Sequence, residues 1–259
     1  MALTPSPQPT RSPGPLALIG GDELNPGNES QDRVLVAAAG AGPAFVLATA
    51  AGRGHPEMAV RHATVWFRAL GLEVKELPAI RRRDVTSGRV AAQARAGRFF
   101  YLVGGDPGRV PTTLAGTAVW DAVIAAWLGG AALAGSSAGA MALGEWTLTR
   151  QRHPGHPDRR YAPGLALIPR IAVVPHLDTF GEGWLAGSLA SRPREDAVLV
   201  GIDERSAAVW QDGTWRAYGP GGVTVFANGE RTRFQAGETV GRIPQPAFDI
   251  DPATDPSGT

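Results

Sequence analysis

The chain has 259 residues, and its 25 basic and 24 acidic side chains leave a net charge of +1 at pH 7. This balance gives no electrostatic reason to expect a nucleic acid or a membrane surface as a partner, and neither is predicted. Cysteine is absent, which excludes disulfides, thiolate metal sites and a cysteine nucleophile. Lys75 is the single lysine, so lysine chemistry is set aside and covalent catalysis would have to use oxygen.

The two ends of the chain are rich in proline. Residues 1–14 have no apolar core of the kind that a secretory signal needs, so they are predicted to be a disordered tail, and residues 243–259 a second proline-rich tail. Without such a signal, the protein is expected in the cytoplasm. Residues 114–143 are weakly polar, but Asp121 and many small residues interrupt them, which indicates buried core and not a membrane span. One domain is predicted, over residues 15–242.

Between the tails, short apolar runs alternate with longer alanine-rich stretches. This alternation is typical of βαβ units, so we expect an α/β fold with helices flanking a mostly parallel sheet. Helices are predicted at residues 55–70, at 112–128 and from Ala138 onward. The predicted strands are PLALIG (15–20), AFVLAT (44–49), GLEVKEL (71–77), FFYLVG (99–104), AALAG (131–135), IAVVP (171–175) and AVLVGI (197–202).

The sequence changes character after Glu204. Asp212-Gly213 and Asn228-Gly229 each separate two strand-like runs, and such pairs favour the two-residue turns of β-hairpins. Antiparallel strands are therefore predicted to complete the sheet towards the carboxyl end of the chain.

A run of small residues, LAGSSAGAMALGE (133–145), spans the point where a predicted strand is followed by a predicted helix. Within it, residues 135–139 fit G-x-S-x-G, the sharp turn that lifts a serine hydroxyl above a sheet, and Ser137 is the middle residue. A chain rich in Gly and Ala also produces this pattern at closely packed turns without catalysis. The motif alone therefore leaves two interpretations, a nucleophile and a packing turn.

Polar or special residues follow four of the predicted strands. Because ligands of open parallel sheets bind beyond the carboxyl ends of the strands, we expect these residues to share one edge. A glycine pair, a hydroxyl, an imidazole and a carboxylate are together the groups that acyl transfer requires. The four strand ends are Gly104-Gly105-Asp106, Ser136-Ser137, His176 and Asp203-Glu204.

Each group has a role in acyl transfer. Serine is a poor nucleophile at neutral pH unless a base lies within hydrogen-bond reach, so Ser137 is the predicted nucleophile and His176 its base. Glu204, at the end of a buried strand, is the preferred carboxylate to orient the imidazole and to stabilise its charged form. Three other carboxylates remain alternatives for that role: Asp203, Asp178 and Glu145.

The tetrahedral oxyanion of acyl transfer needs two preorganised N–H donors. The backbone amides of Gly105 and Ala138 are the predicted pair, since a glycine lets the backbone approach closely. Gly104, Asp106 and Ser136, on the same strand ends, are the predicted substrate contacts.

Residues 153–158, HPGHPD, contain two histidines and an aspartate. Two prolines stiffen this loop, and it lacks the H-x-x-x-H spacing that places two ligands on one helical face. It is interpreted as a solvated loop, and no metal and no cofactor is predicted.

Several of these segments resemble the S51 serine peptidases, the group that contains dipeptidase E and cyanophycinase. The resemblance implies the class I glutamine amidotransferase-like fold, with three layers in which helices flank a mostly parallel, flavodoxin-like sheet. It also implies that Ser137 is the nucleophile, His176 the base and Glu204 the acid. It runs from about Leu16 to about Ala227, and its strongest marks are GSSAGA (135–140), YLVGGD (101–106), YAPGLALIPRIAVVPH (161–176) and GIDERSAAVW (201–210).

The chain departs from the cyanophycinase pattern in two places. The pattern has Gln after a Gly-Gly-Asn strand end, where this chain has Asp106-Pro107-Gly108. It also has an arginine-rich helix after the histidine, where this chain has LDTFGEGWLAGSLA (177–190). These departures argue against a pocket that grips an aspartyl-arginine unit, and we expect a peptidase or amidase acting on short peptides. A small peptide is the expected substrate, and a homodimer is an assembly that the chain could form.

Two other functions stay open from the sequence. One is a catalytically silent amidotransferase-like domain that binds a small ligand or a partner chain. The other is an esterase on the α/β-hydrolase plan, in which the acid lies between serine and histidine, where Asp158 is the late candidate. The order Ser137, His176, Glu204 favours the peptidase. Glutamine amidotransferase activity is not expected, because it needs a thiolate.

Overall fold

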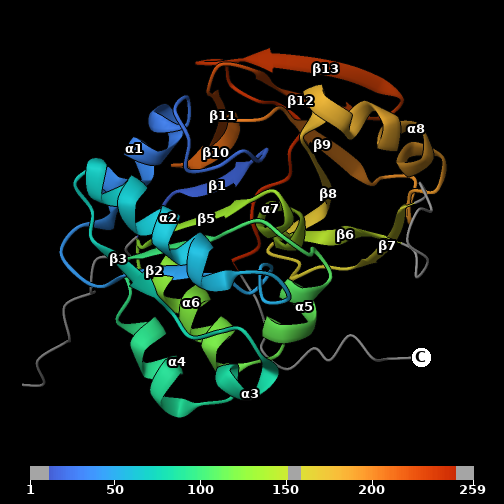
Figure 1. Cartoon of the computed structure of the whole chain (residues 1–259). Coiled ribbons are helices and arrows are strands. Elements are labelled where there is room, and N and C mark those ends of the chain that lie inside the picture. Colours follow the sequence, from blue (N-terminus) through green and yellow to red (C-terminus); the bar gives the residue numbers. More distant parts are fainter. Residues whose placement is uncertain (1–11, 151–158, 249–259) are drawn as a thin grey trace, which may run out of the picture.

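Two adjacent β-sheets with helices packed on their faces make up the computed structural model, which describes residues 12–150 and 159–248 (Figure 1). The expected α/β class, mostly parallel and flanked by helices, is confirmed. The expectation of a single sheet is wrong, because the strands divide into a seven-stranded and a six-stranded sheet.

The first sheet has the strand order β11-β10-β1-β5-β4-β2-β3. The strands β1, β5, β4, β2 and β3 run parallel, and the hairpin of β10 and β11 adds antiparallel to β1. Five of the predicted strands and the first predicted hairpin form this sheet, namely β1 (Leu16–Ile19), β2 (Ala44–Leu47), β3 (Val74–Glu76), β4 (Phe99–Leu102), β5 (Ala132–Ser136), β10 (Ala207–Gln211) and β11 (Thr214–Tyr218).

The second sheet has the order β13-β12-β9-β8-β6-β7, with β6, β8 and β9 parallel. The predicted strands at 171–175 and 197–202 belong here and not beside β5. A run of apolar residues indicates a buried strand, but it does not encode which distant strand will pair with it. The members are β6 (Gly144–Arg150), β7 (Arg159–Pro163), β8 (Ile168–Pro175), β9 (Val198–Ile202), β12 (Gly222–Ala227) and β13 (Glu230–Gln235).

Two of the three predicted helices are confirmed, as α2 and α7. Among the helices of the described ranges, none combines the length and apolar character that crossing a bilayer requires. The helices are α1 (Glu29–Ala39), α2 (Pro56–Ala69), α3 (Arg82–Val85), α4 (Gly88–Arg95), α5 (Arg109–Leu114), α6 (Ala118–Leu128), α7 (Ala138–Leu143), the π-helical turn η1 (Leu177–Gly181) and α8 (Glu182–Ala190).

The predicted helix at 112–128 is wrong, because two helices occupy this stretch. Gly116 has a φ of 61°, which ends the helical path after α5. The hydroxyl of Thr117 then caps α6 by accepting a hydrogen bond from the backbone N–H of Trp120 at 3.3 Å. The break therefore comes from a local turn that apolar periodicity does not detect.

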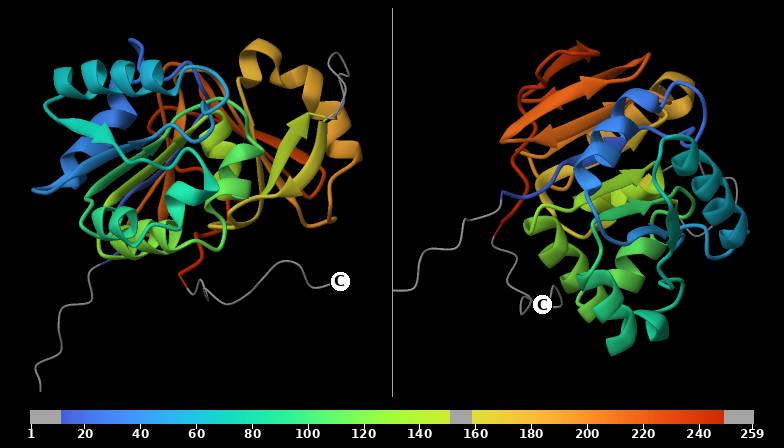
Figure 2. Two further views of the ribbon diagram at one scale, coloured as in Figure 1. Left: turned by 60° about the horizontal axis from the view of Figure 1, so that its bottom comes forward. Right: turned by 90° about the vertical axis from the view of Figure 1, so that its left-hand side faces the viewer.

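Helices cover both faces of the first sheet, with α1 and α2 on one face and α4 and α6 on the other (Figure 2). Alternate residues of each strand point to opposite faces, so one strand contributes to both cores. On the first of these faces, the Phe67 ring of α2 packs edge-on against Phe99 and Tyr101 of β4, with ring centroids 4.9 and 5.2 Å apart. The sheet is thus held rigidly between two helical layers.

Both predicted hairpins are confirmed. Asp212 and Gly213 connect β10 to β11 with φ values of 50° and 80°, and Asn228 and Gly229 connect β12 to β13 with 54° and 79°. Two successive positive φ values are what a type I′ turn requires, and Asp, Asn and Gly tolerate them best.

The predicted tail at 243–259 is packed as far as residue 248, so its boundary is corrected. Ile243 is buried in the core. The ring of Phe248 stacks on Trp127 of α6, with centroids 6.2 Å apart. The same tryptophan also contacts the amino-terminal segment, since Trp127 Nε1 donates to the backbone oxygen of Gly14 at 2.8 Å. Apolar contacts with the buried core and with the Trp127 ring order the chain here despite the prolines.

Gly139 of α7 lies directly against β4, and a Cβ added there would be 2.3 Å from the backbone oxygen of Leu102. We expect Gly139→Ala to destabilise the fold by about 1–3 kcal/mol, because backbone atoms must move apart. The matched control is Gly187→Ala on α8, where an added Cβ meets nothing within 4 Å. Alanine should stabilise that helix by up to about 1 kcal/mol. Urea unfolding measures the free energy of unfolding of both variants. A Gly139→Ala variant as stable as the wild type would contradict the close packing of Gly139 against β4.

Asp32 of α1 is a carboxylate buried against the first sheet. Its Oδ2 accepts a hydrogen bond from Trp66 Nε1 of α2 at 2.8 Å, whereas Oδ1 has no hydrogen-bond partner among the described residues. Burial raises the pKa of Asp32 to about 7, the Trp66 hydrogen bond lowers it, and the charges of Glu23 and Glu29 raise it further.

The stability of the fold should therefore depend on pH through Asp32. An unfolded aspartate ionises at about pH 4, whereas the folded protein keeps this proton up to about pH 7. Stability must fall as the pH rises through this window, by up to roughly 4 kcal/mol. We expect Asp32→Asn, which cannot ionise, to gain stability over the wild type between these two pH values. Urea unfolding across the window checks this, and a constant difference between the two proteins would refute it.

Candidate active site

Ser137 lies at the turn between β5 and α7. Its φ of 49° and ψ of −113° are a backbone conformation that residues other than glycine rarely adopt. Its N–H donates to the backbone oxygen of Ile19 at 2.9 Å, and its carbonyl accepts from the Met141 N–H at 3.0 Å. Hydrogen bonds on both sides therefore hold the strained turn in which the hydroxyl faces a pocket.

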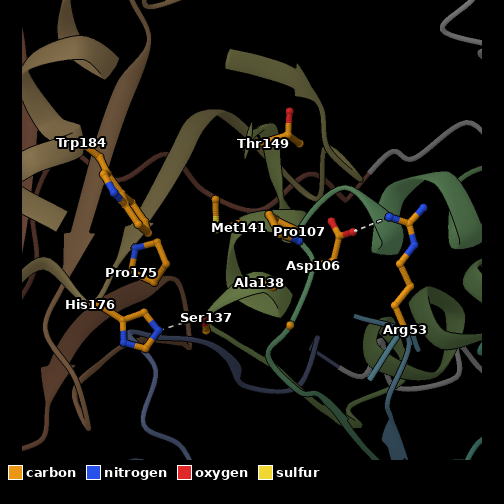
Figure 3. A pocket seen from close by; sticks show the side chains of 11 residues that line it. Arg53, Asp106, Pro107, Ser137, Ala138, Met141, Thr149, Pro175, His176 and Trp184 are labelled. Atoms are coloured by element: carbon orange, nitrogen blue, oxygen red, sulfur yellow. Dashed lines mark hydrogen bonds and ion pairs between the residues drawn. The ribbon is translucent and has the colours of Figure 1, made fainter. Parts of the chain in front are cut away.

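His176 and Glu204 reach this hydroxyl from the second sheet. His176 follows β8, and its Nε2 lies 3.0 Å from Ser137 Oγ (Figure 3). Glu204 follows β9, and its Oε1 lies 2.8 Å from His176 Nδ1. The two side chains are 17% and 27% exposed, so the protein largely shields their contact from water. The three groups form one continuous series of hydrogen bonds, called the Ser–His–Glu chain below.

The carboxyl end of β1 joins the two sheets at this point. The backbone oxygen of Gly20 accepts from the His176 N–H at 2.7 Å, and its N–H donates to the Ser206 oxygen at 2.9 Å. The oxygen of Gly21 accepts from the Arg205 N–H at 2.9 Å. Together with the bond from Ser137 to Ile19, these bonds bring the loops after β5, β8 and β9 against a single strand end.

The alternative carboxylates have other partners. Asp178 accepts a hydrogen bond from the backbone N–H of Glu204 at 3.0 Å, so it supports the loop that carries Glu204. Asp203 is buried and forms an ion pair with Arg233 at 2.5 Å. Glu145 accepts from a backbone N–H of β8 at 2.7 Å. Glu204, the carboxylate preferred from the sequence, is the one whose oxygen lies against the imidazole Nδ1.

Gly105 and Ala138 line the pocket beside Ser137. Gly105 has a φ of 142°, and a Cβ there would lie 2.4 Å from the backbone oxygen of Ala50, so only glycine fits. Within the described part of the chain, neither the Gly105 nor the Ala138 N–H donates to a protein acceptor. Both donors are thus available to an anion that forms next to the serine oxygen.

The pocket in front of the Ser–His–Glu chain has a volume of about 570 Å³. Figure 3 shows Trp184 and Pro175 on the His176 side and Arg53 and Asp106 on the opposite side. The Arg53 guanidinium lies 3.7 Å from the Asp106 carboxylate, and both remain accessible to solvent. One wall is therefore apolar and the other carries both signs of charge. The lining residues are Arg53, Gly105, Asp106, Pro107, Ser137, Ala138, Met141, Thr149, Pro175, His176 and Trp184.

Of the three predicted substrate contacts, Asp106 is among the described residues that line the pocket, whereas Gly104 and Ser136 are not. Ser136 is fully buried, and its Oγ donates to Glu23 Oε2 at 3.0 Å. The Gly104 N–H donates to Glu23 Oε1 at 2.7 Å. Neither residue therefore lines the pocket. Ser136 faces away from Ser137 because consecutive side chains at a strand end point to opposite sides, and the Gly104 N–H is occupied by Glu23.

Glu23 is thus an addition to the predicted site. It closes the stretch Gly20-Gly21-Asp22-Glu23, which follows β1. The signal was present in the sequence, since polar residues after a predicted strand marked the other site residues. Applied to the first predicted strand, the same criterion identifies Glu23.

In the described ranges, no group of three or more histidine, aspartate or glutamate side chains is placed to hold a metal ion. Residues 153–158, which include the alternative acid Asp158, lie outside the described residues. Their interpretation as a solvated loop stays a prediction.

Gly21 packs against the imidazole, since a Cβ added to it would lie 2.2 Å from His176 Cε1. We expect Gly21→Ala to displace the ring and to slow covalent labelling of Ser137 by a fluorophosphonate by about 100-fold. The control is Gly54→Ala, where the nearest atom would be 3.6 Å away and labelling should match the wild type. If Gly21→Ala were labelled as fast as the wild type, the position of the His176 ring would not control the reactivity of Ser137.

Known proteins resemble the chain over most of its length. The model of Peptidase family S51 matches residues 16–217. The cyanophycinases of Trichormus variabilis and of a Nostoc species are each 30% identical to it over 234 residues, which cover 88% of this chain and 77% of theirs. The cyanophycinase of Synechococcus elongatus is 31% identical over 166 residues, covering 61% of this chain and 51% of its own.

The same likeness extends to three dimensions. The crystal structure of a peptidase from an acI-B1 actinobacterium superposes with a TM-score of 0.79 at 27% sequence identity, covering 89% of this chain and 98% of that one. Sequence and fold thus agree over the region that contains Ser137, His176 and Glu204. The chain belongs to peptidase family S51 and is a serine-type peptidase.

Proposed function

We propose that the protein hydrolyses short peptides through an acyl-enzyme on Ser137. The observation that carries the proposal is the Ser–His–Glu chain, with distances of 3.0 Å from Ser137 Oγ to His176 Nε2 and 2.8 Å from His176 Nδ1 to Glu204. Both lie within the range in which a proton passes directly between groups. The hydroxyl also opens into a pocket and is not buried in the core.

The steps follow from this geometry. Ser137 Oγ attacks the peptide carbonyl carbon while His176 Nε2 takes its proton, and Glu204 stabilises the resulting imidazolium. The carbonyl oxygen becomes an oxyanion that accepts hydrogen bonds from the N–H groups of Gly105 and Ala138. The C–N bond then breaks, and the imidazolium gives its proton to the leaving amine. A water molecule then attacks the acyl carbon while His176 takes its proton. The bond between this carbon and Ser137 Oγ breaks, and His176 returns the proton to the serine oxygen.

The pocket supports a short substrate that carries charge. A volume of about 570 Å³ suits a ligand of a few residues. Arg53 can receive a substrate carboxylate, and Asp106 a cationic group, so a peptide with both charges complements this wall. Trp184 and Pro175 offer an apolar surface to the other side of the substrate.

Cyanophycin cleavage is the second candidate, and the name of the relatives at 30% identity favours it. Two sequence features favour short peptides instead. The oxyanion strand of this chain continues as Asp106-Pro107-Gly108, and the segment after His176 contains no arginine up to residue 190. These segments border the pocket, so a change in them alters what the pocket can hold.

The other two functions have less support. A catalytically silent domain would have no reason to keep an imidazole between a strained serine and a shielded carboxylate. An esterase on the α/β-hydrolase plan would take its acid from the segment between Ser137 and His176. Here the carboxylate that contacts the imidazole is Glu204, which comes after His176 in the sequence.

We expect a fluorophosphonate to label the wild-type protein at Ser137 and to leave Ser137→Ala unlabelled. His176→Ala should react at least about 10³-fold more slowly, because the serine loses its base. Ser191→Ala, at an exposed serine after α8, is the matched control and should label like the wild type. Intact-mass and peptide mass spectrometry measure the adduct. Labelling of Ser137→Ala, or an unlabelled wild type, would refute the acyl-enzyme.

A peptide panel then separates the two candidate substrates. It contains α-aspartyl, β-aspartyl, arginyl and neutral dipeptides, longer peptides of the same composition, and cyanophycin. Release of amines from short peptides, abolished by Ser137→Ala, is the expected result. Cleavage of cyanophycin alone would replace short-peptide hydrolysis by the second candidate.

A further inference from the structure

Glu23 contacts two neighbouring strand ends of the active site. Its Oε1 accepts a hydrogen bond from the Gly104 N–H at 2.7 Å, and its Oε2 accepts one from Ser136 Oγ at 3.0 Å. Gly104 directly precedes Gly105, and Ser136 directly precedes Ser137. One carboxylate therefore holds the residue before an oxyanion donor and the residue before the nucleophile.

The direction of the Gly105 N–H depends on Gly104, because the two residues share a peptide plane. Rotation of the Gly104 backbone would turn this N–H away from the pocket, and a glycine offers little steric resistance to such rotation. Glu23 restrains Gly104 on one side. On the other side, the Asp106 N–H donates to the backbone oxygen of Ala50 at 2.9 Å. The oxyanion donor thus lies between two hydrogen-bonded anchors.

The same contact is closely packed. A Cβ at Gly104 would lie 2.9 Å from Glu23 Oε1 and 3.3 Å from Ser137 Cβ. Gly104 therefore has no room for a side chain between the carboxylate and Ser137. Glu23 belongs to the β1 end, which also holds Ser137 and His176 through backbone hydrogen bonds.

The charge of Glu23 disfavours the ionised forms of two buried neighbours. Tyr101 and Asp32 are fully buried, and the charge of Glu23 raises the pKa of each, although burial is the larger cause in both. Glu23 is itself only partly exposed, so its charge would be costly there without hydrogen-bond donors. Its two donors offset this, because a carboxylate accepts on both oxygens whereas an amide accepts on one.

We propose that Glu23 is a positioning residue for peptide hydrolysis, which sets the direction of the Gly105 oxyanion donor and the placement of Ser137. It does not touch the reacting atoms, and it acts through Gly104 and Ser136. The inference rests on the proposed function of the Ser–His–Glu chain.

Glu23→Ala leaves Gly104 and Ser136 without their acceptor. We expect kcat to fall by about 10- to 100-fold with little change in KM, because oxyanion donors act mainly in the transition state. The affinity for a peptide boronic acid, which forms a tetrahedral anion on the serine, should fall by the same factor, while that for the amine product stays constant. Glu23→Gln keeps one acceptor oxygen for Gly104 and should recover most of the lost rate.

Glu29→Ala is the matched control. Glu29 Oε2 also accepts from a glycine N–H, that of Gly27 at 2.7 Å, but outside the pocket, so its removal should leave kcat unchanged. If Glu23→Ala does not fold, Glu23→Asp replaces it, since its shorter side chain cannot span both donors. A lower melting temperature with unchanged kcat, equal losses of boronate and product affinity, or a Gln variant no better than Ala would each overturn the proposal.

Fluorophosphonate labelling separates this inference from the proposed function. If the wild type is labelled but cleaves no peptide, the proposed function fails, while the labelling rates of the Glu23 variants still test the positioning role. If peptides are cleaved and Glu23→Ala matches Glu29→Ala, the positioning role alone is overturned. A wild type that is not labelled overturns both.

Discussion

The site depends on a few backbone hydrogen bonds at the carboxyl end of β1. Ile19, Gly20 and Gly21 bind the loops that follow β5, β8 and β9 through bonds of 2.7–2.9 Å. A Cβ on Gly20 would lie 2.0 Å from the backbone oxygen of Asp203, so the second sheet approaches this strand end as closely as a backbone can. Without these bonds Ser137 and His176 would lie in separate parts of the molecule, because they follow strands of different sheets.

Strain and hydrogen bonding are concentrated at the same place. Ser137 and His176 have φ values of 49° and 50°, and both backbone N–H groups are bound by the β1 end. Such conformations persist only where the surroundings determine them fully. Glu23 extends this scaffold to Gly104, so the proposed oxyanion donor Gly105 and the proposed nucleophile Ser137 both follow residues that it holds. Preorganisation of this kind lets donors stabilise developing charge without first reorganising.

The pocket lies at the seam of the two sheets, and its inner and outer parts come from different kinds of element. The Ser–His–Glu chain follows β5, β8 and β9, whose residues are mostly buried in the hydrophobic core. The outer walls come instead from exposed loops, which carry Arg53 and Asp106, and from α8, which carries Trp184. Loops tolerate substitution far better than strand ends, so the outer walls can change without disturbing the Ser–His–Glu chain.

The sequence by itself determined eleven of the thirteen described strands, both hairpin turns and the serine turn, because each depends on a short local pattern of apolar residues, Gly, Asp or Asn. It did not predict β6 and β7, which lie in a segment where a helix or no element was expected. The rule that polar residues follow parallel strands also identified Ser137, His176 and Glu204 as neighbours. Only the tertiary structure decided that these strands form two sheets, that Asp203 pairs with Arg233 while the next residue faces His176, and that Ser136 turns to Glu23. Strand pairing and side-chain direction join residues far apart in the chain, and a local pattern contains no record of those distant partners.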